Sequence, residues 1–477
     1  MSSVQTKSET TLEDSIDGVS GEFVDFAGER YYAIRNVRQM PPFFISLVSS
    51  DDHWLFTSST GGLTAGRVSP QTALFPYVTD DKLHDNAASV GPVTVIRADG
   101  GAWLWEPLDR HGLSGHSRHL YKSVLGDKLC FEEVNHDLGL LFRYTWSTSA
   151  EFGFVRDCEL CNIGDETVDV EIVDGLRNIL PAGTPRFTQT NSSNLVDAYK
   201  WSELDEATGL AFFTLYSCIT DRAEPCESLR ATTAFCLGPE TADVLLSDEQ
   251  LRAFRQGAKF EQETHKRGIR GSFLISHVAS LAAGESSKWR IVLDGEQTQS
   301  AASRLRRRLS QPRALHNAID ESVAAGTDRL ARIMASADGL QVTAEENVAV
   351  HHYANVLFNV LRGGIFADQY RVPGRDFRRA VRHFNKPVFE RHRAFLDALP
   401  ERLRIDDLLA QVDETGDRQL QRLTREYLPI TFGRRHGDPS RPWNQFASRL
   451  KDDRGEDLLS YEGNWRDIFQ NWEALAL

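Results

Sequence analysis

The sequence is short of the features that mark secreted and membrane proteins. Its 477 residues include only six cysteines, too few for a disulfide framework in a chain of this length. The N-terminus lacks the apolar segment of a secretory signal, and no stretch approaches the roughly 20 apolar residues that a membrane span needs. A cytoplasmic location without membrane association is therefore the expectation.

The chain also lacks an excess of basic residues. Its formal net charge is -14, with 54 lysines and arginines against 68 aspartates and glutamates. Nucleic acids and anionic membranes bind basic faces, so neither is an expected partner. An acidic balance still permits a local basic pocket for one phosphate ion. Length and composition are those of an ordinary globular protein with about two or three domains.

Most of the first 295 residues predict β-structure. Residues 1–20 are polar and acidic and are expected to form a disordered tail. From 21 to 295, short runs of β-branched and aromatic residues alternate with Gly, Asn and Asp. Val168, Val170 and Ile172 alternate with acidic residues, which is the pattern of a half-buried strand. The region therefore predicts a large antiparallel β-sandwich domain.

The pattern then changes to a helical period. Two helices separated by Pro312 are expected within 296–340, which we interpret as a helical linker. Arg304 to Arg308 place a basic face on the first helix, and this face is expected to pair with the acidic sandwich. Residues 341–477 are also helical in pattern, and their first helix is expected to end at Gly363-Gly364.

An irregular segment interrupts the strands between residues 63 and 85. It is rich in polar and aromatic residues but has no clean period, and long irregular loops often carry function or form interfaces. One interpretation places its polar side chains at a substrate entrance. The other makes the segment a surface excursion that packs on a neighbouring domain. The candidate entrance residues are Arg67, Asp80, Asp81, His84 and Asp85.

The end of the chain carries two side-chain stripes at helical spacing. The aromatic stripe consists of Trp465, Phe469 and Trp472. The polar stripe consists of two pairs that are four residues apart, Arg466 with Gln470 and Asp467 with Asn471. A guanidinium, a carboxylate and two amides offer forked donors and acceptors that match sugar hydroxyls. The alternative is a surface helix with ordinary ion pairs.

Residues Gly463 to Asn471 resemble the Gly-x-x-(Arg-Asp)-x-x-Gln-Asp stretch of inverting disaccharide phosphorylases of the cellobiose phosphorylase type. Arg466, Asp467 and Gln470 match, and Asn471 stands where the family has Asp. In that family the stretch opens a helix of an (α/α)6 barrel and holds the sugar on the non-reducing side of the scissile bond. The resemblance implies an N-terminal β-supersandwich, a helical linker and a partial (α/α)6 barrel at 341–477, with Trp465 beside the sugar.

The reaction that this resemblance implies is phosphorolysis of a β-glucoside with inversion, which produces a sugar 1-phosphate. Inorganic phosphate would be a co-substrate, and no metal or organic cofactor is expected. In the family the general acid lies far downstream in the barrel, whereas this sequence ends at Leu477. We therefore expect a truncated chain, or a barrel completed in a homodimer or by a partner chain. Hydrolysis on the same scaffold and a non-catalytic carbohydrate-binding or assembly subunit are the alternatives.

Two polar loops are further candidates for contacts with phosphate or sugar. The loop ahead of the motif contributes Arg434, Arg435, His436 and Arg441. Its alternative interpretation is a rigid solvated connector tied by Asp438 to an arginine. The second loop, at 362–376, has glycines that could cradle phosphate but lacks the sequence of a nucleotide-binding loop.

The cysteines and the remaining histidines predict no site. Cys158 and Cys161 face opposite sides of a predicted strand, and no second pair follows, so both are expected to be structural. His116 and His119 lie in a Gly/Ser-rich stretch and are expected at the surface. The sequence therefore predicts no metal centre.

Overall fold

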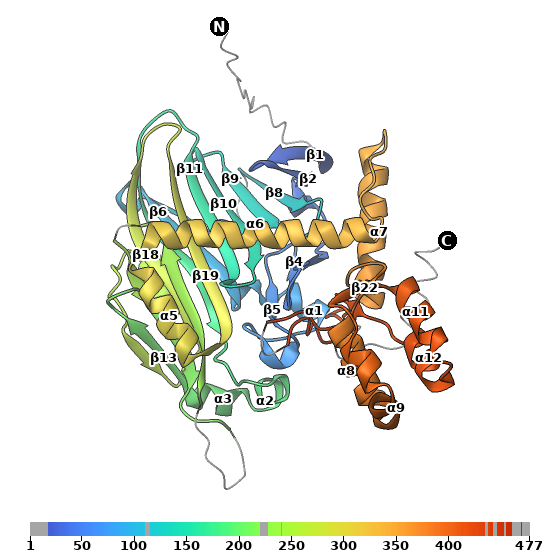
Figure 1. Ribbon diagram of the computed structural model, residues 1–477. Helices are drawn as coiled ribbons and strands as arrows, with labels where there is room; N and C mark the ends of the chain where they lie inside the picture. Colours follow the sequence, from blue (N-terminus) through green and yellow to red (C-terminus); the bar gives the residue numbers. More distant parts are fainter. Residues whose placement is uncertain are drawn as a thin grey trace.

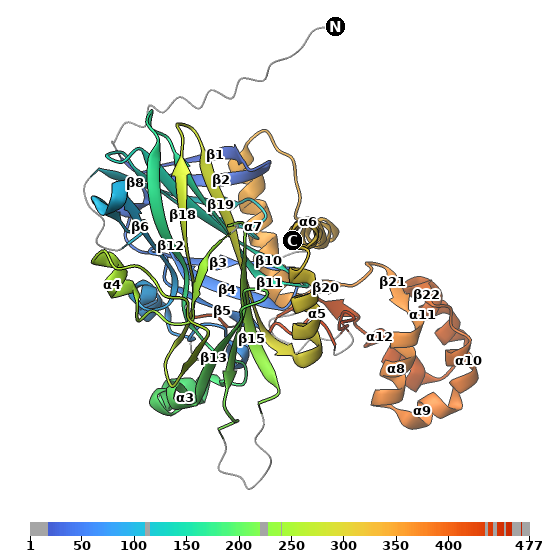
Figure 2. The same cartoon turned by 90° about the vertical axis from the view of Figure 1, so that its left-hand side faces the viewer.

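Two large antiparallel sheets dominate the part of the chain that the structure describes (Figure 1). The structure is a computed structural model, and it describes residues 18–109, 115–219, 228–239, 241–434, 437–441, 446–452, 455–459 and 469. One long helix crosses the larger sheet, a second stands beside the sheet edge, and a group of short helices lies apart from both sheets (Figures 1 and 2). The chain is therefore a mixed β and α protein, as the sequence predicted.

Hydrogen bonding gives each sheet a definite strand order. The eleven-stranded sheet runs in the order β1 (Ser20–Phe26), β2 (Glu29–Arg35), β8 (His116–Ser123), β9 (Leu129–Asn135), β10 (Leu140–Ser149), β11 (Gly153–Asn162), β19 (Ser286–Thr298), β15 (Arg230–Leu237), β14 (Leu210–Leu215), β13 (Lys200–Asp205) and β17 (His265–Arg267). The five-stranded sheet runs in the order β16 (Asp243–Leu245), β18 (Gly271–Leu281), β12 (Val168–Ile179), β6 (Gly91–Ala98) and β7 (Trp103–Trp105). A three-stranded sheet consists of β3 (Phe44–Leu47), β4 (His53–Ser58) and β5 (Leu63–Arg67). The loops contain the short helices α1 (Asp80–Leu83), α2 (Arg186–Asn191), α3 (Ser193–Tyr199) and α4 (Leu251–Arg255).

The main apolar core lies between the two large sheets. Phe142 and Trp146 of β10 belong to the same buried cluster as Val170 and Ile172 of β12. Asp169, which precedes Val170, is exposed, and Glu171 between the two β12 residues is half-buried, which confirms the alternation predicted for this strand. Further along β12 both faces are buried, because apolar residues of α4 cover the outer face. Burial of side chains on facing sheets is the dominant stabilising contribution to such a sandwich.

One ion pair is enclosed in this core. Neither Arg156 of β11 nor Asp174 of β12 has any exposed side-chain surface. Arg156 donates to the Asp174 carboxylate from Nη1 at 2.6 Å and from Nη2 at 3.0 Å. Trp289 Nε1 and Thr94 Oγ1 donate to the same carboxylate, each at 2.7 Å. Asp174 thus joins strands of both large sheets through hydrogen bonds, and its charge is fully paired.

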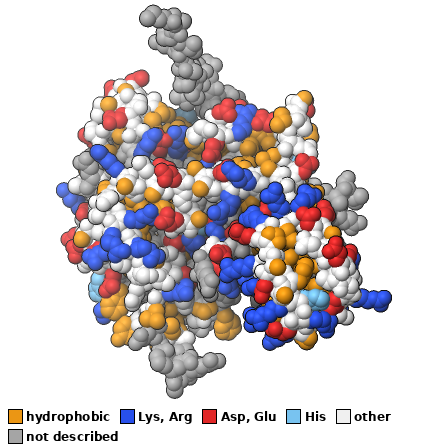
Figure 3. Space-filling view, in the orientation of Figure 1, with side chains coloured by type: hydrophobic (Ala, Val, Ile, Leu, Met, Phe, Trp, Pro, Cys, Tyr) orange, Lys and Arg blue, Asp and Glu red, His pale blue; other side chains and the backbone are white. Residues whose placement is uncertain are grey.

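Two helices cover the outer face of the larger sheet. The helices α5 (Gln299–Leu309) and α6 (Pro312–Ser336) are separated by the predicted break at Pro312. Leu309 and Leu315 of these helices pack in one cluster with Phe152 and Phe235 of the sheet. Basic side chains gather over α5 (Figure 3). Arg306 pairs with Asp205 at 2.8 Å, and Arg308 pairs with Glu151 at 2.5 Å, which confirms the predicted pairing of this face with the sandwich.

The helix α7 (Glu346–Gly363) packs on α6 beside the edge of the larger sheet (Figure 1). Tyr353, Val356 and Val360 pack on Leu330 of α6 in a separate buried cluster. The helix ends at Gly364, with a φ of 73°, as the sequence predicted. A Cβ at Gly364 would lie 2.3 Å from Ile430 Cγ2, so this glycine permits the close packing of the loop on β23.

A separate helical unit is inserted directly after α7. β20 (Ile365–Phe366) pairs with β23 (Ile430–Thr431), so the chain leaves and returns at the same point. The intervening residues form β21 (Arg371–Pro373), α8 (Gly374–Phe384), α9 (Lys386–Arg391), α10 (Arg393–Asp397), β22 (Arg402–Arg404), α11 (Ile405–Glu414) and α12 (Arg418–Arg425). Their buried apolar residues form a cluster that contains no residue of the sandwich. The barrel predicted at 341–477 is therefore interrupted by a unit with its own core, and the barrel itself stays a prediction.

Replacing residues 368–428 by a short Gly-Ser linker is expected to leave the sandwich folded. The ends of the inserted unit lie on paired strands and its core is its own, which is the situation in which domain insertions are tolerated. Differential scanning calorimetry should place the melting temperature of the remaining protein within about 4 °C of the intact chain. Insoluble protein, or a loss of cooperative melting, would show that the unit stabilises the sandwich.

Two local predictions are wrong. Residues 63–67, predicted as irregular, form strand β5, which pairs with β4 from His53↔Arg67 to Thr57↔Leu63. His116 and His119, predicted at the surface, lie in β8, where the His119 residue is only 2% exposed. The prediction for the two histidines was wrong because the flanking glycines and serines are typical of surface loops. The burial of β8 depends instead on its pairing with β2 and β9.

Candidate functional site

The predicted sugar subsite lies outside the described residues. Trp465, Arg466, Asp467, Gln470 and Asn471 belong to this group, as do Arg435 and His436 of the preceding loop. Phe469 is described, and it is 68% exposed. The geometry of the terminal motif therefore stays a prediction, whereas Arg434 and Arg441 of the loop can be placed.

Arg434 is buried against the sandwich. Its Nη2 donates to the backbone oxygen of Asp51 at 3.2 Å and to that of Ser49. Burial lowers the pKa of the guanidinium to about 10. These contacts favour a structural role in which Arg434 ties the loop to the sandwich. Near Arg441 the chain forms a turn, in which the Arg441 N–H donates to the Asp438 carbonyl oxygen at 2.9 Å.

Ion pairs surround the place where Arg434 meets the sandwich. Asp51 is 3% exposed and pairs with Arg329 of α6 at 2.9 Å and also with Lys451. The strands, the linker helix and the C-terminal segment therefore meet at one carboxylate. Because these charged side chains pair with one another, this contact between the three segments is better suited to holding them together than to binding a substrate.

The segment 63–85 packs on the C-terminal residues. Arg67 donates from Nε to Asp294 at 2.7 Å and from Nη1 to Asp52 at 2.8 Å, with its side chain largely buried. The Asp80 N–H donates to the Pro439 carbonyl oxygen at 3.1 Å, and His84 Nδ1 lies 2.8 Å from Ser58 Oγ. These contacts favour the interpretation as an excursion that packs on a neighbouring segment over that of a substrate entrance.

Aromatic packing strengthens the same contact. The Phe446 ring lies 5.4 Å from the ring of Trp54 and 5.9 Å from that of Tyr77, and these three residues share one buried cluster. Each such ring pair stabilises the folded state by about 0.5–1.5 kcal/mol, in addition to the hydrophobic effect of the area that it buries. The irregular composition of the segment therefore reflects an interface within the chain.

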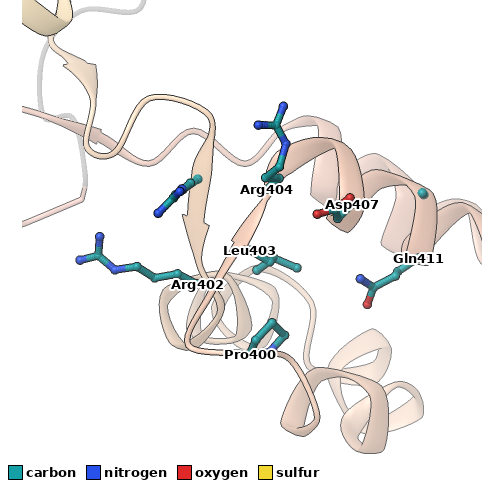
Figure 4. Close-up of a pocket in the computed structure, with 8 residues that line it drawn as sticks. Pro400, Arg402, Leu403, Arg404, Asp407 and Gln411 are labelled. Carbon is teal, nitrogen blue, oxygen red and sulfur yellow. The ribbon is translucent and has the colours of Figure 1, made fainter.

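The inserted unit carries an arginine-lined cleft of about 520 Å³ (Figure 4). Arg371 and Arg404 stand directly opposite each other on the β21–β22 ladder, and Arg402 lies two residues before Arg404. Three guanidinium groups therefore share one face, while Val372 and Leu403 turn to the buried core of the unit. Like charges in such positions repel, so this arrangement favours a ligand with acceptor groups.

Two of the three arginines have partners. Arg402 Nη1 lies 2.6 Å from Asp368 Oδ2, and Arg404 Nη2 lies 3.2 Å from Asp406 Oδ2. Across the described ranges, no carboxylate lies within ion-pair distance of Arg371. Asp407 and Gln411 are four residues apart on α11 and also line the cleft (Figure 4).

The cleft therefore repeats the chemistry predicted for the terminal motif. Arg371, Asp407 and Gln411 supply a guanidinium, a carboxylate and an amide, which together match the hydroxyl groups of a saccharide. Sequence reasoning missed this set because β21 and α11 are far apart in the chain. The only local signal was the alternation Arg402-Leu403-Arg404, which places two cations on one face of a strand.

No group of three or more potential metal ligands was found among the residues that the structure describes. Cys158 is buried and Cys161 partly buried, on opposite faces of β11, in agreement with the expectation that they are structural. In the same residues, no helix is both long and apolar enough to cross a membrane.

Comparison with solved structures gives distant likenesses only. A protein assigned as an aldose 1-epimerase from Escherichia coli K12 has 14% identity and a TM-score of 0.28, over 54% of this chain and 99% of that chain. A protein assigned as a kojibiose phosphorylase from the human microbiome has 9% identity and a TM-score of 0.35, over 70% of this chain and 43% of that chain. Neither supports an inference about function, because both TM-scores are low. A search of curated proteins found no match.

Comparison with protein families gives a match inside the chain. Residues 366–429 match the model of the glycoside hydrolase family 149 insertion domain 1. These are the residues between the paired strands β20 and β23, so the boundaries of the match agree with those of the inserted unit. The match confirms that the chain resembles carbohydrate-active proteins of the glycoside phosphorylase and glycoside hydrolase group, with an insertion domain of the family 149 type.

Proposed function

We propose that this chain belongs to an enzyme that cleaves a β-glucoside by phosphorolysis with inversion. The observation that carries the proposal is the family 149 insertion domain at 366–429, which precedes the Gly463–Asn471 motif in the chain. The motif and the insertion domain lie in different parts of the sequence. Both point to proteins that act on glycosidic bonds.

The proposed organisation assigns one role to each region. Residues 21–295 form the sandwich domain, 296–340 the linker, and 341–477 the beginning of an (α/α)6 barrel that contains the insertion. The sugar on the non-reducing side is held by Arg466, Asp467, Gln470 and Asn471, with Trp465 beside the ring. No residue is assigned as the general acid.

Phosphorolysis needs fewer protein groups than hydrolysis. Phosphate itself attacks the anomeric carbon, so one carboxylic acid suffices to protonate the leaving oxygen. The remaining demand is for donors and acceptors that hold the sugar hydroxyls as positive charge develops on the ring, and for cations that hold phosphate. Arg466 with Asp467 meets the first demand. Arg435, His436 and Arg441 are the candidates for the second, and Arg434 is less suitable because of its contacts with the sandwich.

Isothermal titration of glucose, cellobiose and β-1,2-glucobiose, with and without inorganic phosphate, tests the proposal. Arg466→Ala is expected to reduce saccharide affinity at least tenfold, because a charged hydrogen bond is lost from the subsite. Arg332→Ala is the matched control, since the Arg332 side chain is 79% exposed on α6 and pairs with Asp328, four residues earlier in the same helix. Saccharide binding that is equal in the wild type and in Arg466→Ala would refute the subsite.

A second function has its own supporting observation. The arginine-lined cleft lies on the inserted unit, away from the motif in sequence, and supplies Arg371, Asp407 and Gln411 for a saccharide. A non-catalytic carbohydrate-binding or assembly subunit would use this cleft without turning substrate over. Saccharide binding without release of a sugar 1-phosphate in the presence of phosphate would favour this function.

A further inference from the structure

A cavity of about 370 Å³ opens at one edge of the five-stranded sheet. β7 pairs with β6 at Ile96, Arg97 and Ala98, so among the described residues the first half of β6 has no paired strand on that side. The cavity lies along this uncovered part, which contributes Pro92, Val93 and Thr94. An uncovered strand edge presents backbone donors and acceptors, which a ligand can use.

Tyr144 is the tyrosine that lines the cavity. Its ring is fixed by stacking on Phe131 at 5.2 Å and by the Arg156 guanidinium, which lies 4.3 Å from the ring centre. The tyrosine is only 3% exposed, and its hydroxyl has no hydrogen-bond partner among the described residues. Gly61 stands opposite, where an added Cβ would lie 3.8 Å from the hydroxyl oxygen. A hydroxyl that lines the cavity and has no protein partner is available to a ligand.

Arg177 forms the wall of the cavity. It donates from Nη1 to the Ala88 carbonyl oxygen at 2.6 Å and from Nη2 to that of Ala87 at 2.7 Å, which fixes the turn after α1. The side chain is largely buried, its Nε has no partner, and burial lowers its pKa. This wall is thus ordered before a ligand binds, which reduces the loss of conformational entropy on binding.

The mouth of the cavity carries a balanced pair of charges. Arg255 of α4 donates from Nε and Nη2 to the two carboxylate oxygens of Glu106, each at 2.7 Å. About a third of the Arg255 side chain is exposed, so the pair faces solvent and can accept or donate hydrogen bonds at its outer side. Because Glu106 neutralises Arg255, the mouth does not select for a charged ligand.

We propose that this cavity binds a neutral monosaccharide unit, at a site separate from the terminal motif. Its size falls within the range of about 300–1,000 Å³ that is usual for small-molecule sites. Its polar groups are hydroxyl, carboxylate and guanidinium, and its walls at Pro92, Val93 and Leu108 are apolar. A pyranose ring likewise combines polar and apolar surface, with hydroxyl groups at its rim and C–H groups on its faces. The inference does not depend on phosphorolysis.

Titration of D-glucose into the full chain carrying Arg466→Ala removes the contribution of the proposed terminal subsite. The Tyr144→Phe comparison then separates this cavity from the arginine-lined cleft, which Tyr144 does not line. Tyr144→Phe in that background is expected to weaken glucose binding about tenfold, through the loss of one buried hydrogen bond. Its melting temperature without sugar should stay unchanged, because the hydroxyl has no protein partner. Arg255→Ala, at the mouth, is expected to weaken binding less.

Tyr353→Phe is the matched control. The Tyr353 hydroxyl donates to the Leu125 carbonyl oxygen at 2.9 Å in a different cluster, so its loss should lower the melting temperature and leave glucose affinity unchanged. Equal glucose affinity with and without the Tyr144 hydroxyl would refute the proposal, as would the absence of glucose binding in the Arg466→Ala background. Binding of inorganic phosphate that depends on Tyr144 would refute the assignment to a neutral ligand. The Arg466→Ala comparison with wild type reports on the phosphorylase subsite separately.

Discussion

Replacing Asp174 by alanine is expected to lower the free energy of unfolding by about 3–5 kcal/mol. The substitution leaves Arg156 without its carboxylate in a position where the guanidinium has no exposed surface. It also removes the acceptor of Trp289 Nε1 and Thr94 Oγ1. Equilibrium unfolding in urea, followed by tryptophan fluorescence, measures the change, and cooperativity should be retained.

Asp169→Ala is the control on the same strand. Asp169 is exposed, so its loss should change stability by less than about 0.5 kcal/mol. The double replacement of Arg156 by Met and Asp174 by Leu is expected to recover most of the loss, because two apolar side chains need no partner. An Asp174→Ala protein as stable as the wild type would mean that water reaches Arg156 in the folded state.

Replacing Arg67 by methionine is expected to destabilise the protein by about 3 kcal/mol at neutral pH, because Asp294 loses its bidentate partner. Asp294 is 5% exposed, and burial raises the pKa of its carboxyl even with Arg67 in place. Without Arg67 the pKa should rise further. The folded state would then bind a proton more readily than the unfolded state, in which an aspartate has a pKa of about 3.9.

The sign of the pH dependence follows from this difference. As pH falls from 7 through the raised pKa of Asp294, the folded variant takes up a proton before the unfolded chain does, so its stability relative to wild type increases. Denaturation at several pH values should show the deficit shrinking toward acid. Arg332→Ala, which removes an exposed ion pair within one helix, should show almost no deficit at any pH. A deficit for Arg67→Met that is independent of pH would point to lost packing in place of an unpaired carboxylate.

Local patterns predicted the sandwich because each strand carries its own evidence. The alternation around Val170 and Ile172 predicts which face is buried, and the structure buries it. Pro312 and Gly364 likewise mark a helix start and a helix end through backbone chemistry that acts within a few residues.

The sequence interpretation failed where burial depends on distant partners. Residues 63–67 form a strand because β4 offers a ladder, and Arg67 is buried because Asp294 lies beside it. For Arg434 the phosphate contact stays a prediction, and the structure places its guanidinium against two carbonyl oxygens of the sandwich. No pattern near an arginine indicates whether its partner is a ligand or the remote backbone.

The sequence by itself determined the class of this protein: antiparallel strands first, helices after them, and a motif that resembles the phosphorylase group. These properties follow from periodicity and from short motifs, which are local. Only the tertiary structure separated the inserted unit from the helices around it, through the pairing of Ile365 with Thr431 and a core of its own. It alone brought Arg371 to Asp407, and Tyr144 to Gly61, because side chains far apart in the chain become neighbours only when the sheets and helices pack.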